Sequence, residues 1–267
     1  MANFIHPTAI IMEGAVIGND NHIGPYCIIH ENVNLGNNNV LKSHVIIDGF
    51  SHIGDNNQFF PFASIGSVTQ DKKYIGEESQ LVIGNNNIFR EYTTANPGTL
   101  KGMTTKIGNN CLFMVSSHIA HDCYVGNDVT LANCVALAGH VRVDDFVIIG
   151  GLSAVLQRTR IGAHAMIGGM SGVAEDVIPY GLVMGERAHL AGLNVVGLKR
   201  RQFSRDSIHD IRRAYEKIFL DEEGTFSERL RMTKEEFSDS KEVMLMLQFL
   251  TEDNANAICK PKAKASV

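Results

Sequence analysis

The chain has 267 residues, a formal net charge of −5 at pH 7 and a hydrophobic fraction of 44%. This acidic balance argues against binding to nucleic acid, and no apolar run reaches the length of a transmembrane helix, so we expect no integral membrane segment. No basic region with an apolar core precedes the first repeat, which predicts a cytoplasmic protein without a secretory signal.

An apolar residue recurs at every sixth position of the chain from Ile5 to Val173. The exceptions are Asp71, Glu77 and Lys101. A repeat held over this length predicts a parallel β-helix. Three six-residue units would close one triangular coil, so that residues 18 apart would stack on successive coils separated by about 4.8 Å.

Small residues mark other positions of the repeat. Glycine often follows the apolar position directly, and we predict that it forms the corners because it tolerates positive φ. The cysteines are irregularly spaced, which indicates reduced thiols rather than a disulfide framework. Cys27, Cys111 and Cys123 are predicted to fill the core as small side chains.

Two polar stretches, 67–81 and 97–106, interrupt the repeat without shifting its frame. Each is interpreted as a loop extruded from an intact coil. Loops on a rigid scaffold often hold functional residues.

The repeat ends at Pro179–Tyr180, and a helical pattern begins after Gly192. Ser204 is predicted as the N-cap of a helix that runs to Phe219. Further helices are predicted over 226–237 and 241–250. The expected organisation is therefore a hexapeptide-repeat β-helix over 1–185 and a C-terminal helical domain over 186–267.

The spacing of the repeat places His121, Gly139 and Gln157 on successive coils at one edge of the prism. A histidine beside a carboxylate, here Asp122, is a suitable general base because its pKa lies near working pH. The N–H of Gly139 could stabilise an oxyanion in the same site. No serine or cysteine is placed as a nucleophile, which favours direct attack by a bound acceptor.

Two alternatives account for the same histidines. They could be ordinary polar residues at coil corners. His118, His121 and His140 could instead bind zinc between subunits, as in a trimeric hexapeptide-repeat hydratase. We favour acyl transfer, because the hydratase leaves the polar loop and the helical region unexplained.

The strongest basic cluster is Lys199, Arg200 and Arg201, followed by further arginines on the next helix. It could be a solvated helix face. It could also recognise phosphates or dock an acidic carrier protein.

Several segments resemble the UDP-N-acetylglucosamine O-acyltransferases of lipid A biosynthesis. The matching segments are 41–45, 62–66, 70–74, 118–123, 137–141, 148–151 and 197–201. The most specific are His-Ile-Ala-His-Asp-Cys at 118–123 and Gly-Leu-Lys-Arg-Arg at 197–201. The resemblance covers the chain from about residue 5 to 220.

The resemblance implies a left-handed β-helix and a cytoplasmic homotrimer with active sites between neighbouring prisms. It implies transfer of a 3-hydroxyacyl chain from acyl carrier protein to the 3-position of the UDP-sugar, without metal or cofactor. His121 would be the base, Asp122 would orient it and Gly139 would hold the oxyanion. Substrate contacts would come from Gln70, Asp71, Lys73, His118, His140, Gln157, Asn194, Arg200 and Arg201. Gly169 would act as an acyl ruler that leaves room for a long chain.

The chain departs from the family pattern at three places. Leu156 stands where relatives carry histidine, Val196 replaces an acidic residue, and Asn96–Pro97 replaces a common His-Arg pair. The reaction class is unaffected, but the acceptor remains open between a 3-hydroxyl and a 3-amino sugar. An acetyltransferase that uses coenzyme A is the alternative within the same fold.

Overall fold

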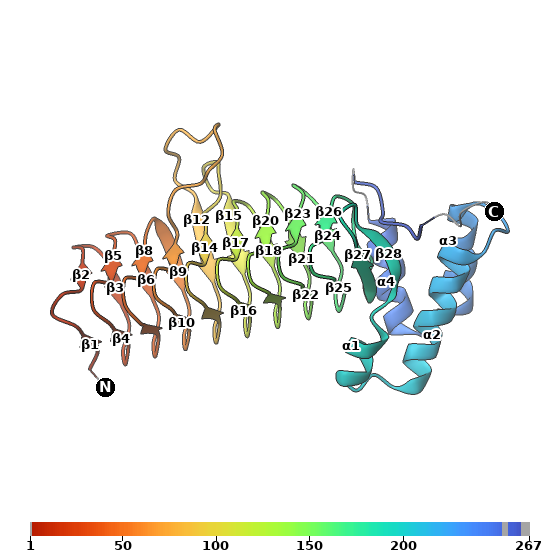
Figure 1. The fold of residues 1–267 in the computed structure, drawn as a ribbon, viewed down its shortest axis with the longest axis horizontal. Coiled ribbons are helices and arrows are strands. Elements are labelled where there is room, and N and C mark those ends of the chain that lie inside the picture. Colours follow the sequence, from red (N-terminus) through yellow and green to blue (C-terminus); the bar gives the residue numbers. More distant parts are fainter. Residues whose placement is uncertain (1, 253–255, 263–267) are drawn as a thin grey trace.

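The computed structural model describes residues 2–252 and 256–262. Most of these residues form an elongated prism with three sheet faces, and helices follow at its C-terminal end (Figure 1). Strands from successive coils pair in parallel; among the described strands only β27 (Gly181–Met184) and β28 (His189–Leu193) pair antiparallel. The predicted left-handed parallel β-helix with a C-terminal helical part is confirmed.

The strands are short and lie one behind another in each described sheet. The first sheet, with 11 strands, contains β1 (Phe4–Ile5), β4 (His22–Ile23), β7 (Val40–Leu41), β10 (Gln58–Phe59), β13 (Ile88–Phe89), β16 (Leu112–Phe113), β19 (Thr130–Leu131), β22 (Ile148–Ile149), β25 (Met166–Ile167), β27 and β28. The second sheet, with 9 strands, contains β2 (Ile10–Ile11), β5 (Ile28–Ile29), β8 (Ile46–Ile47), β11 (Ser64–Ile65), β14 (Thr94–Ala95), β17 (His118–Ile119), β20 (Ala136–Leu137), β23 (Ala154–Val155) and β26 (Gly172–Val173). The third sheet, with 8 strands, contains β3 (Val16–Ile17), β6 (Asn34–Leu35), β9 (Phe50–Ile53), β12 (Gln80–Ile83), β15 (Thr104–Ile107), β18 (Tyr124–Val125), β21 (Arg142–Val143) and β24 (Arg160–Ile161).

The repeated apolar residue points into the prism. Phe59, Phe89 and Phe113 occupy neighbouring strands of the first sheet, are fully buried, and stack at ring-centroid separations of 5.0 and 4.7 Å. Burial of one such side chain stabilises the fold by about 1.5–3 kcal/mol. The three cysteines predicted for the core are buried as well, which confirms that prediction.

The corners of the coils are built differently from the prediction. Left-handed φ occurs at the third residue after the apolar one, for example at Asn38 (φ 54°) and His44 (φ 55°). The glycine next to the apolar residue has an ordinary φ in most coils and lies against the backbone of the next coil. At Gly24, an added Cβ would lie 1.5 Å from the carbonyl oxygen of Lys42. The prediction of positive φ at these glycines holds at Gly66 (φ 83°) and is wrong at the others, where close approach of the coils requires the absence of a side chain.

Two loops leave the prism where the repeat lapses. The first loop, 66–79, joins β11 to β12, and the second loop, 96–103, joins β14 to β15. They project together from one side of the prism (Figure 1). Asn96 connects them, since its Nδ2 donates to the carbonyl oxygen of Ser67 at 2.9 Å. The strands resume at Gln80 and Thr104, a little earlier than expected, and pair in register across both loops.

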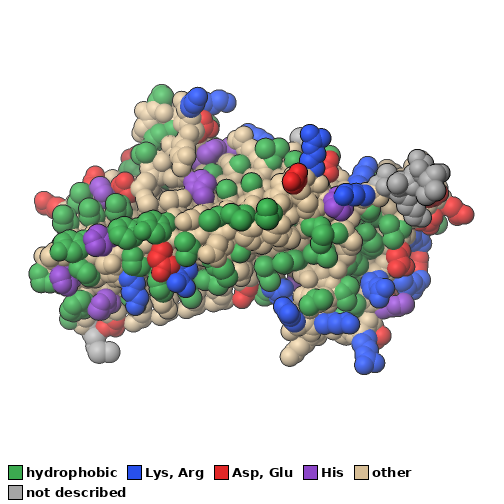
Figure 2. All heavy atoms as spheres, viewed as in Figure 1, with side chains coloured by type: hydrophobic (Ala, Val, Ile, Leu, Met, Phe, Trp, Pro, Cys, Tyr) green, Lys and Arg blue, Asp and Glu red, His purple; other side chains and the backbone are tan. Residues whose placement is uncertain are grey.

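An exposed apolar row runs along the edge between the first and second sheets. Tyr26, Phe62, Tyr92, Leu152 and Met170 occupy equivalent corner positions on this edge and are between 47% and 71% exposed. Figure 2 shows a row of hydrophobic side chains along the prism in this place. His44, Ser116 and Cys134 occupy the intermediate positions of this edge. A concentration of exposed apolar side chains marks an interaction site more often than ordinary solvent-facing surface does.

The helices follow the hairpin of β27 and β28, and the predicted domain boundary at 185/186 falls in its turn. They are α1 (Val195–Arg200), α2 (Arg205–Tyr215), the π-helix η1 (Glu216–Leu220), α3 (Phe226–Glu236) and α4 (Lys241–Thr251). Ser204 caps α2 as predicted, because its side chain accepts from the N–H of Ser207 at 3.0 Å. No helix among the described residues is long and apolar enough to span a bilayer.

Arg160 joins the last coils to α4. Its Nε donates to Asp176 at 2.7 Å, one terminal nitrogen donates to Glu252 at 2.7 Å, and its guanidinium lies 4.4 Å from the ring centroid of Phe249. Arg160 is 8% exposed. This network holds the last coils and α4 in one relative orientation. A change of orientation would separate Arg160 from Asp176 or Glu252 and leave a buried charge without its partner.

His164 lies in an aromatic cluster between the last coils and the helices. Its ring stacks on Phe146 and Tyr180 at centroid separations of 4.7 and 5.7 Å and meets Phe203 edge-on at 5.0 Å. Burial, reinforced by the positive charge of Arg201, lowers the pKa of His164 from 6.5 to about 4. The cluster therefore keeps this imidazole neutral well below neutral pH.

We expect the free energy of unfolding to decrease as the pH falls from about 6.5 to about 4. In this window the unfolded chain binds a proton at His164 that the folded chain does not bind, because the folded pKa is depressed. His164→Phe should flatten this part of the curve, measured by urea unfolding at a series of pH values. His209→Phe, at an exposed position of α2, is the matched control. An unchanged slope in His164→Phe would contradict the expectation.

Candidate active site

His121 and Asp122 form a hydrogen-bonded pair at the corner between β17 and β18. Nδ1 of His121 lies 2.8 Å from Oδ2 of Asp122, and the two side chains are 11% and 3% exposed. Buried Ile119 at the end of β17 fixes the register of this corner. Because Nδ1 faces the carboxylate, Nε2 is the nitrogen that can accept a proton from a substrate.

The second loop holds Asp122 in place. The Thr99 hydroxyl donates to Oδ2 of Asp122, and the Thr99 N–H donates to Oδ1 at 3.2 Å. The Asp122 N–H donates to the hydroxyl oxygen of Thr105 at 2.8 Å. Gly98 permits this approach, since an added Cβ would lie 2.8 Å from Oδ1 of Asp122. Sequence reasoning missed Thr99 and Gly98, because the loop lies outside the repeat and its contacts have no fixed spacing, and it also missed Thr105 on β15.

Gly139 lies against the imidazole of His121, one coil further along, as the spacing predicts. A Cβ at Gly139 would lie 2.2 Å from Cε1 and 2.3 Å from Nε2 of His121. Gly139 is buried, and no acceptor among the described residues bonds its N–H. The N–H is therefore available beside the nitrogen that would take the substrate proton.

His140 and Gln157 lie at the same edge. Nε2 of His140 is 3.6 Å from Oδ2 of Asp122, and its ring meets that of His121 edge-on at a centroid separation of 5.2 Å. Burial lowers the pKa of His140. Gln157 is exposed one coil further along. The structure thus groups four of the predicted residues with Asp122 at one edge.

The first loop brings Asp71 to this edge. Oδ2 of Asp71 lies 3.8 Å from Nε2 of His121. The backbone N–H of Lys73 donates to Oδ1 of Asp71 at 2.9 Å and orients it. The Gln70 and Lys73 side chains are exposed on the same loop. Asp71 therefore faces the reacting nitrogen, while Gln70 and Lys73 point to solvent in the single chain.

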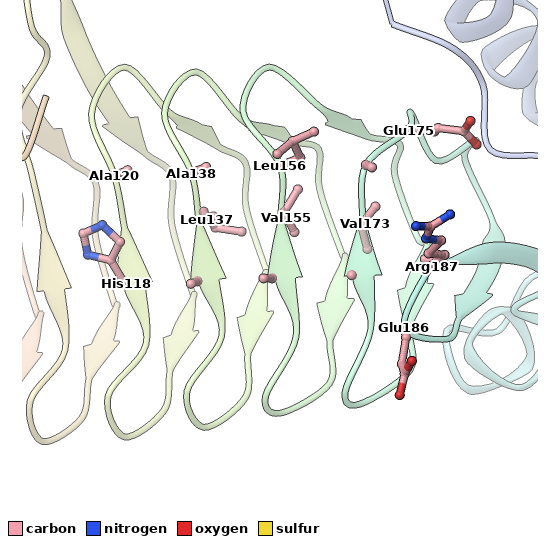
Figure 3. A pocket seen from close by; sticks show the side chains of 15 residues that line it. His118, Ala120, Leu137, Ala138, Val155, Leu156, Val173, Glu175, Glu186 and Arg187 are labelled. Atoms are coloured by element: carbon pink, nitrogen blue, oxygen red, sulfur yellow. The ribbon is translucent and has the colours of Figure 1, made fainter.

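His118 precedes the pair on β17. Its Nδ1 lies 2.7 Å from the Thr94 hydroxyl oxygen, and burial lowers its pKa. It stands at one end of a groove of about 770 Å³ that runs along the outer face of the second sheet (Figure 3). Small residues line much of the groove, and they are Ala120, Ala136, Ala138, Ala154, Gly172, Ala174 and Ala188.

Leu156 and three charged residues limit this groove. Leu156 is 58% exposed and projects from a row that otherwise consists of alanines. Glu175, Glu186 and Arg187 close the end opposite His118 (Figure 3). The apolar lining between these two ends suits an unbranched apolar chain, because such a chain has no polar groups that need partners there.

The other predicted contacts lie at different edges of the chain. Asn194 caps α1, accepting from the Gly197 N–H at 3.0 Å and donating to the carbonyl oxygen of His164 at 2.9 Å. Arg201 packs over the ring of Phe146 at 5.0 Å, and Arg200 is exposed. These residues lie at the corner between the third and first sheets. Gly169 is exposed at the corner between the first and second sheets. One chain therefore does not bring Asn194, Arg200, Arg201 or Gly169 to His121.

One set of side chains in the described part of the chain has the geometry to hold a cation. Ligand atoms of His121, Asp122 and His140 all lie within 4.8 Å of one another. The set differs from the trio considered for a hydratase, because His118 is not part of it.

The six-residue repeats of the prism, with the His121–Asp122 pair at one edge, place the chain in the class of hexapeptide-repeat transferases once its match to that family's model is considered. Residues 14–49 and 104–139 match the family model for bacterial transferase hexapeptide repeats. Residues 176–259 match the model for the second domain of UDP-N-acetylglucosamine O-acyltransferase. The chain belongs to the UDP-N-acetylglucosamine acyltransferase family, as its likeness to solved members shows.

Three solved structures illustrate the likeness. The UDP-N-acetylglucosamine acyltransferase of Francisella novicida is 37% identical, with 97% of this chain and 95% of that chain covered and a TM-score of 0.92. The enzyme of Moraxella catarrhalis is 40% identical, with coverage of 96% and 99% and a TM-score of 0.91. That of Campylobacter jejuni is 38% identical, with coverage of 97% and 100% and a TM-score of 0.90. The likeness includes the helices as well as the prism.

Proposed function

We propose that this protein works in the cytoplasm and transfers a 3-hydroxyacyl chain from acyl carrier protein to the 3-hydroxyl of UDP-N-acetylglucosamine, the first step of lipid A biosynthesis. The observation that carries the proposal is the His121–Asp122 pair packed against Gly139. Membership of the family supports the reaction class and the sugar nucleotide.

The reaction needs one base and one oxyanion site. Nε2 of His121 takes the proton of the sugar hydroxyl while its oxygen attacks the thioester carbonyl carbon. The N–H of Gly139 donates to the oxyanion of the tetrahedral intermediate. Collapse re-forms the carbonyl and breaks the C–S bond, and the protonated His121 returns its proton to the leaving sulfur. Asp122 stabilises the imidazolium between these two steps.

We further propose that the active protein is a homotrimer with sites between neighbouring prisms. The predicted substrate residues occupy three different edges of one chain, so a site that includes all of them needs residues from more than one copy. The exposed apolar row between the first and second sheets supports such packing. In a cyclic trimer each interface joins two different faces, so the row of one chain would pack against another face of its neighbour.

The donor thioester would reach the site beside the basic cluster of α1. Arg200 is exposed and available to an acidic carrier or to the diphosphate of the sugar nucleotide. Arg201 is already positioned over an aromatic ring, which lowers the entropy cost of binding a phosphate. The groove next to His118 would take the acyl chain.

Gly169 is proposed to set the acyl length. In a trimer of parallel prisms, residues 121 and 169 are separated along the prism axis by about 13 Å, from two and two-thirds coils of about 4.8 Å each. An extended chain advances about 1.3 Å per carbon, so a chain of more than about ten carbons would pass the level of Gly169.

We expect Gly169→Met to shift preference to acyl chains of about ten carbons or fewer. If four methylenes lose their contacts at about 0.8 kcal/mol each, kcat/KM for the longer donors should fall by about two orders of magnitude. Donors loaded on acyl carrier protein in a length series would measure the change. Gly169→Ala is the control, because its Cβ would meet only backbone atoms of Gly151, the oxygen at 3.2 Å and the nitrogen at 3.8 Å, and its effect should be small. An unchanged length profile in the methionine variant contradicts the assignment.

The function is tested with purified protein, acyl carrier protein loaded with several 3-hydroxyacyl chains, and two UDP-sugars that carry a 3-hydroxyl or a 3-amino group. Mass spectrometry should show the acylated hydroxyl sugar and free carrier thiol. Acetyl coenzyme A should be a poor donor in the same assay. Preferred use of coenzyme A, or transfer to neither sugar, rejects the proposal. Preference for the amino sugar changes the acceptor and retains the reaction class.

A further inference from the structure

Three side chains surround the carboxylate of Asp122. Oδ2 lies 2.8 Å from Nδ1 of His121 and 3.6 Å from Nε2 of His140, and it accepts a hydrogen bond from the Thr99 hydroxyl. The side chains of His121, Asp122 and His140 are 11%, 3% and 22% exposed. Two imidazole nitrogens and one carboxylate oxygen are thus collected in a largely water-excluded corner.

This arrangement resembles the donor set of a zinc site. Zinc binds histidine nitrogen at about 2.0–2.1 Å and carboxylate oxygen at about 2.0–2.2 Å, so neighbouring ligands of a tetrahedral ion lie about 3.3 Å apart. The two separations from Asp122 Oδ2, 2.8 and 3.6 Å, bracket this value. One ligand atom from each of the three side chains lies within 4.8 Å of the other two. His140, the most exposed of the three side chains, is the one that would move to complete the site. The fourth position is left for water.

We propose that His121, Asp122 and His140 form an inhibitory binding site for Zn²⁺. The metal bonds Nδ1 of His121 and displaces the proton that this nitrogen shares with Asp122. That proton moves to Nε2 of the same ring, so the imidazole stays neutral and its second nitrogen becomes a donor. Asp71, whose Oδ2 lies 3.8 Å from Nε2, is placed to accept from it.

The consequence for catalysis follows from this proton. An imidazole that is metal-bound at Nδ1 and protonated at Nε2 has no lone pair with which to accept the hydroxyl proton. The ion therefore blocks the base without entering the reaction. Imidazole ligands favour Zn²⁺, Co²⁺, Ni²⁺ and Cu²⁺ over Mg²⁺, which prefers oxygen ligands and retains its waters.

Thr99 acts as the supporting residue of this site. Its hydroxyl donates to the same carboxylate oxygen and its N–H to the other. Such contacts hold a ligating carboxylate in one orientation and raise metal affinity. The site is therefore built from two coils and the second loop, and all of its groups come from one chain.

The test is a direct binding measurement on the full chain after removal of metals with a chelator. Zn²⁺ is titrated in competition with a chromophoric chelator, and Co²⁺ is titrated while its visible d–d absorption is recorded. We expect one ion per chain with an affinity in about the micromolar range, an intense tetrahedral Co²⁺ spectrum, and no competition from Mg²⁺.

Two variants remove one ligand each, and one variant is a matched control. His140→Ala and Asp122→Asn should each weaken binding by at least about tenfold. His30→Ala is the control, because His30 lies 3.4 Å from Asp48 and 3.9 Å from Glu31 in another histidine–carboxylate group. Circular dichroism of each variant establishes folding, and His140→Gln replaces His140→Ala if the latter unfolds.

The proposal is supported if both site variants lose the Co²⁺ spectrum and His30→Ala retains it. Stoichiometric binding that survives both site variants, or is lost in His30→Ala, places the ion elsewhere and overturns it. Absence of binding below about 1 mM also overturns it. In the acyl-transfer assay, added Zn²⁺ should inhibit and excess chelator should restore the initial rate; a rate that zinc leaves unchanged while the ion is bound contradicts the inhibitory role.

Discussion

Replacing His121 by alanine is expected to lower kcat by about 10²–10⁴-fold, the usual contribution of a general base. The reason is the position of Nε2, which lies beside the free N–H of Gly139 while Nδ1 is held by Asp122. KM for the sugar nucleotide should change much less, because the base acts on a proton that moves only in the transition state. Steady-state kinetics with both substrates varied would measure the two effects separately.

The fold of the His121→Ala variant should be intact. The side chain lies at an outer corner, while the buried core beneath it consists of residues such as Ile119 and Leu137. His52→Ala, at an exposed position of β9, serves as the control for removal of an imidazole from the prism. Near-normal turnover by a folded His121→Ala variant would show that another group is the base.

The prism could be predicted from sequence because one physical requirement repeats. Each coil must bury an apolar residue on each face, and this leaves a six-residue signal from Ile5 to Val173. The role of the glycines could not be read from the same signal. Glycine serves both left-handed φ and close approach of backbones, and only coordinates distinguish them. At Gly24 an added Cβ would lie 1.5 Å from the Lys42 oxygen, which shows that glycine is needed there for the close approach of two backbones.

The candidate site was predictable to the extent that it follows the repeat. A spacing of 18 residues placed His121 against Gly139, and the structure confirms this contact. Thr99 was missed because its bond to Asp122 spans a loop in which position carries no geometric meaning. Asn194 stays a predicted substrate contact, and the structure adds that its amide caps a helix in the single chain. Contacts between copies leave no spacing in the sequence, so the edges that would meet in the proposed trimer could not be predicted from it.

Gly139→Ala is expected to reduce kcat by about 10²-fold or more, even though alanine keeps the backbone N–H. The φ of Gly139 lies outside the left-handed range, so the backbone accepts alanine, and the obstacle is steric. The new Cβ would lie 2.2 Å from Cε1 and 2.3 Å from Nε2 of His121. The imidazole must therefore move away, and it loses its alignment with the substrate hydroxyl.

A double-mutant cycle distinguishes this mechanism from a direct effect on the oxyanion. In the His121→Ala background no ring is present to collide with the new methyl group, so Gly139→Ala should cost little further activity. The coupling free energy between the two substitutions, obtained from kcat of the single and double variants, should then nearly equal in size the whole loss caused by Gly139→Ala alone. If the two losses multiply instead, the methyl group disturbs the oxyanion or the thioester rather than the base. Full activity of the single Gly139→Ala variant would mean that His121 is not the base in the position where the structure holds it.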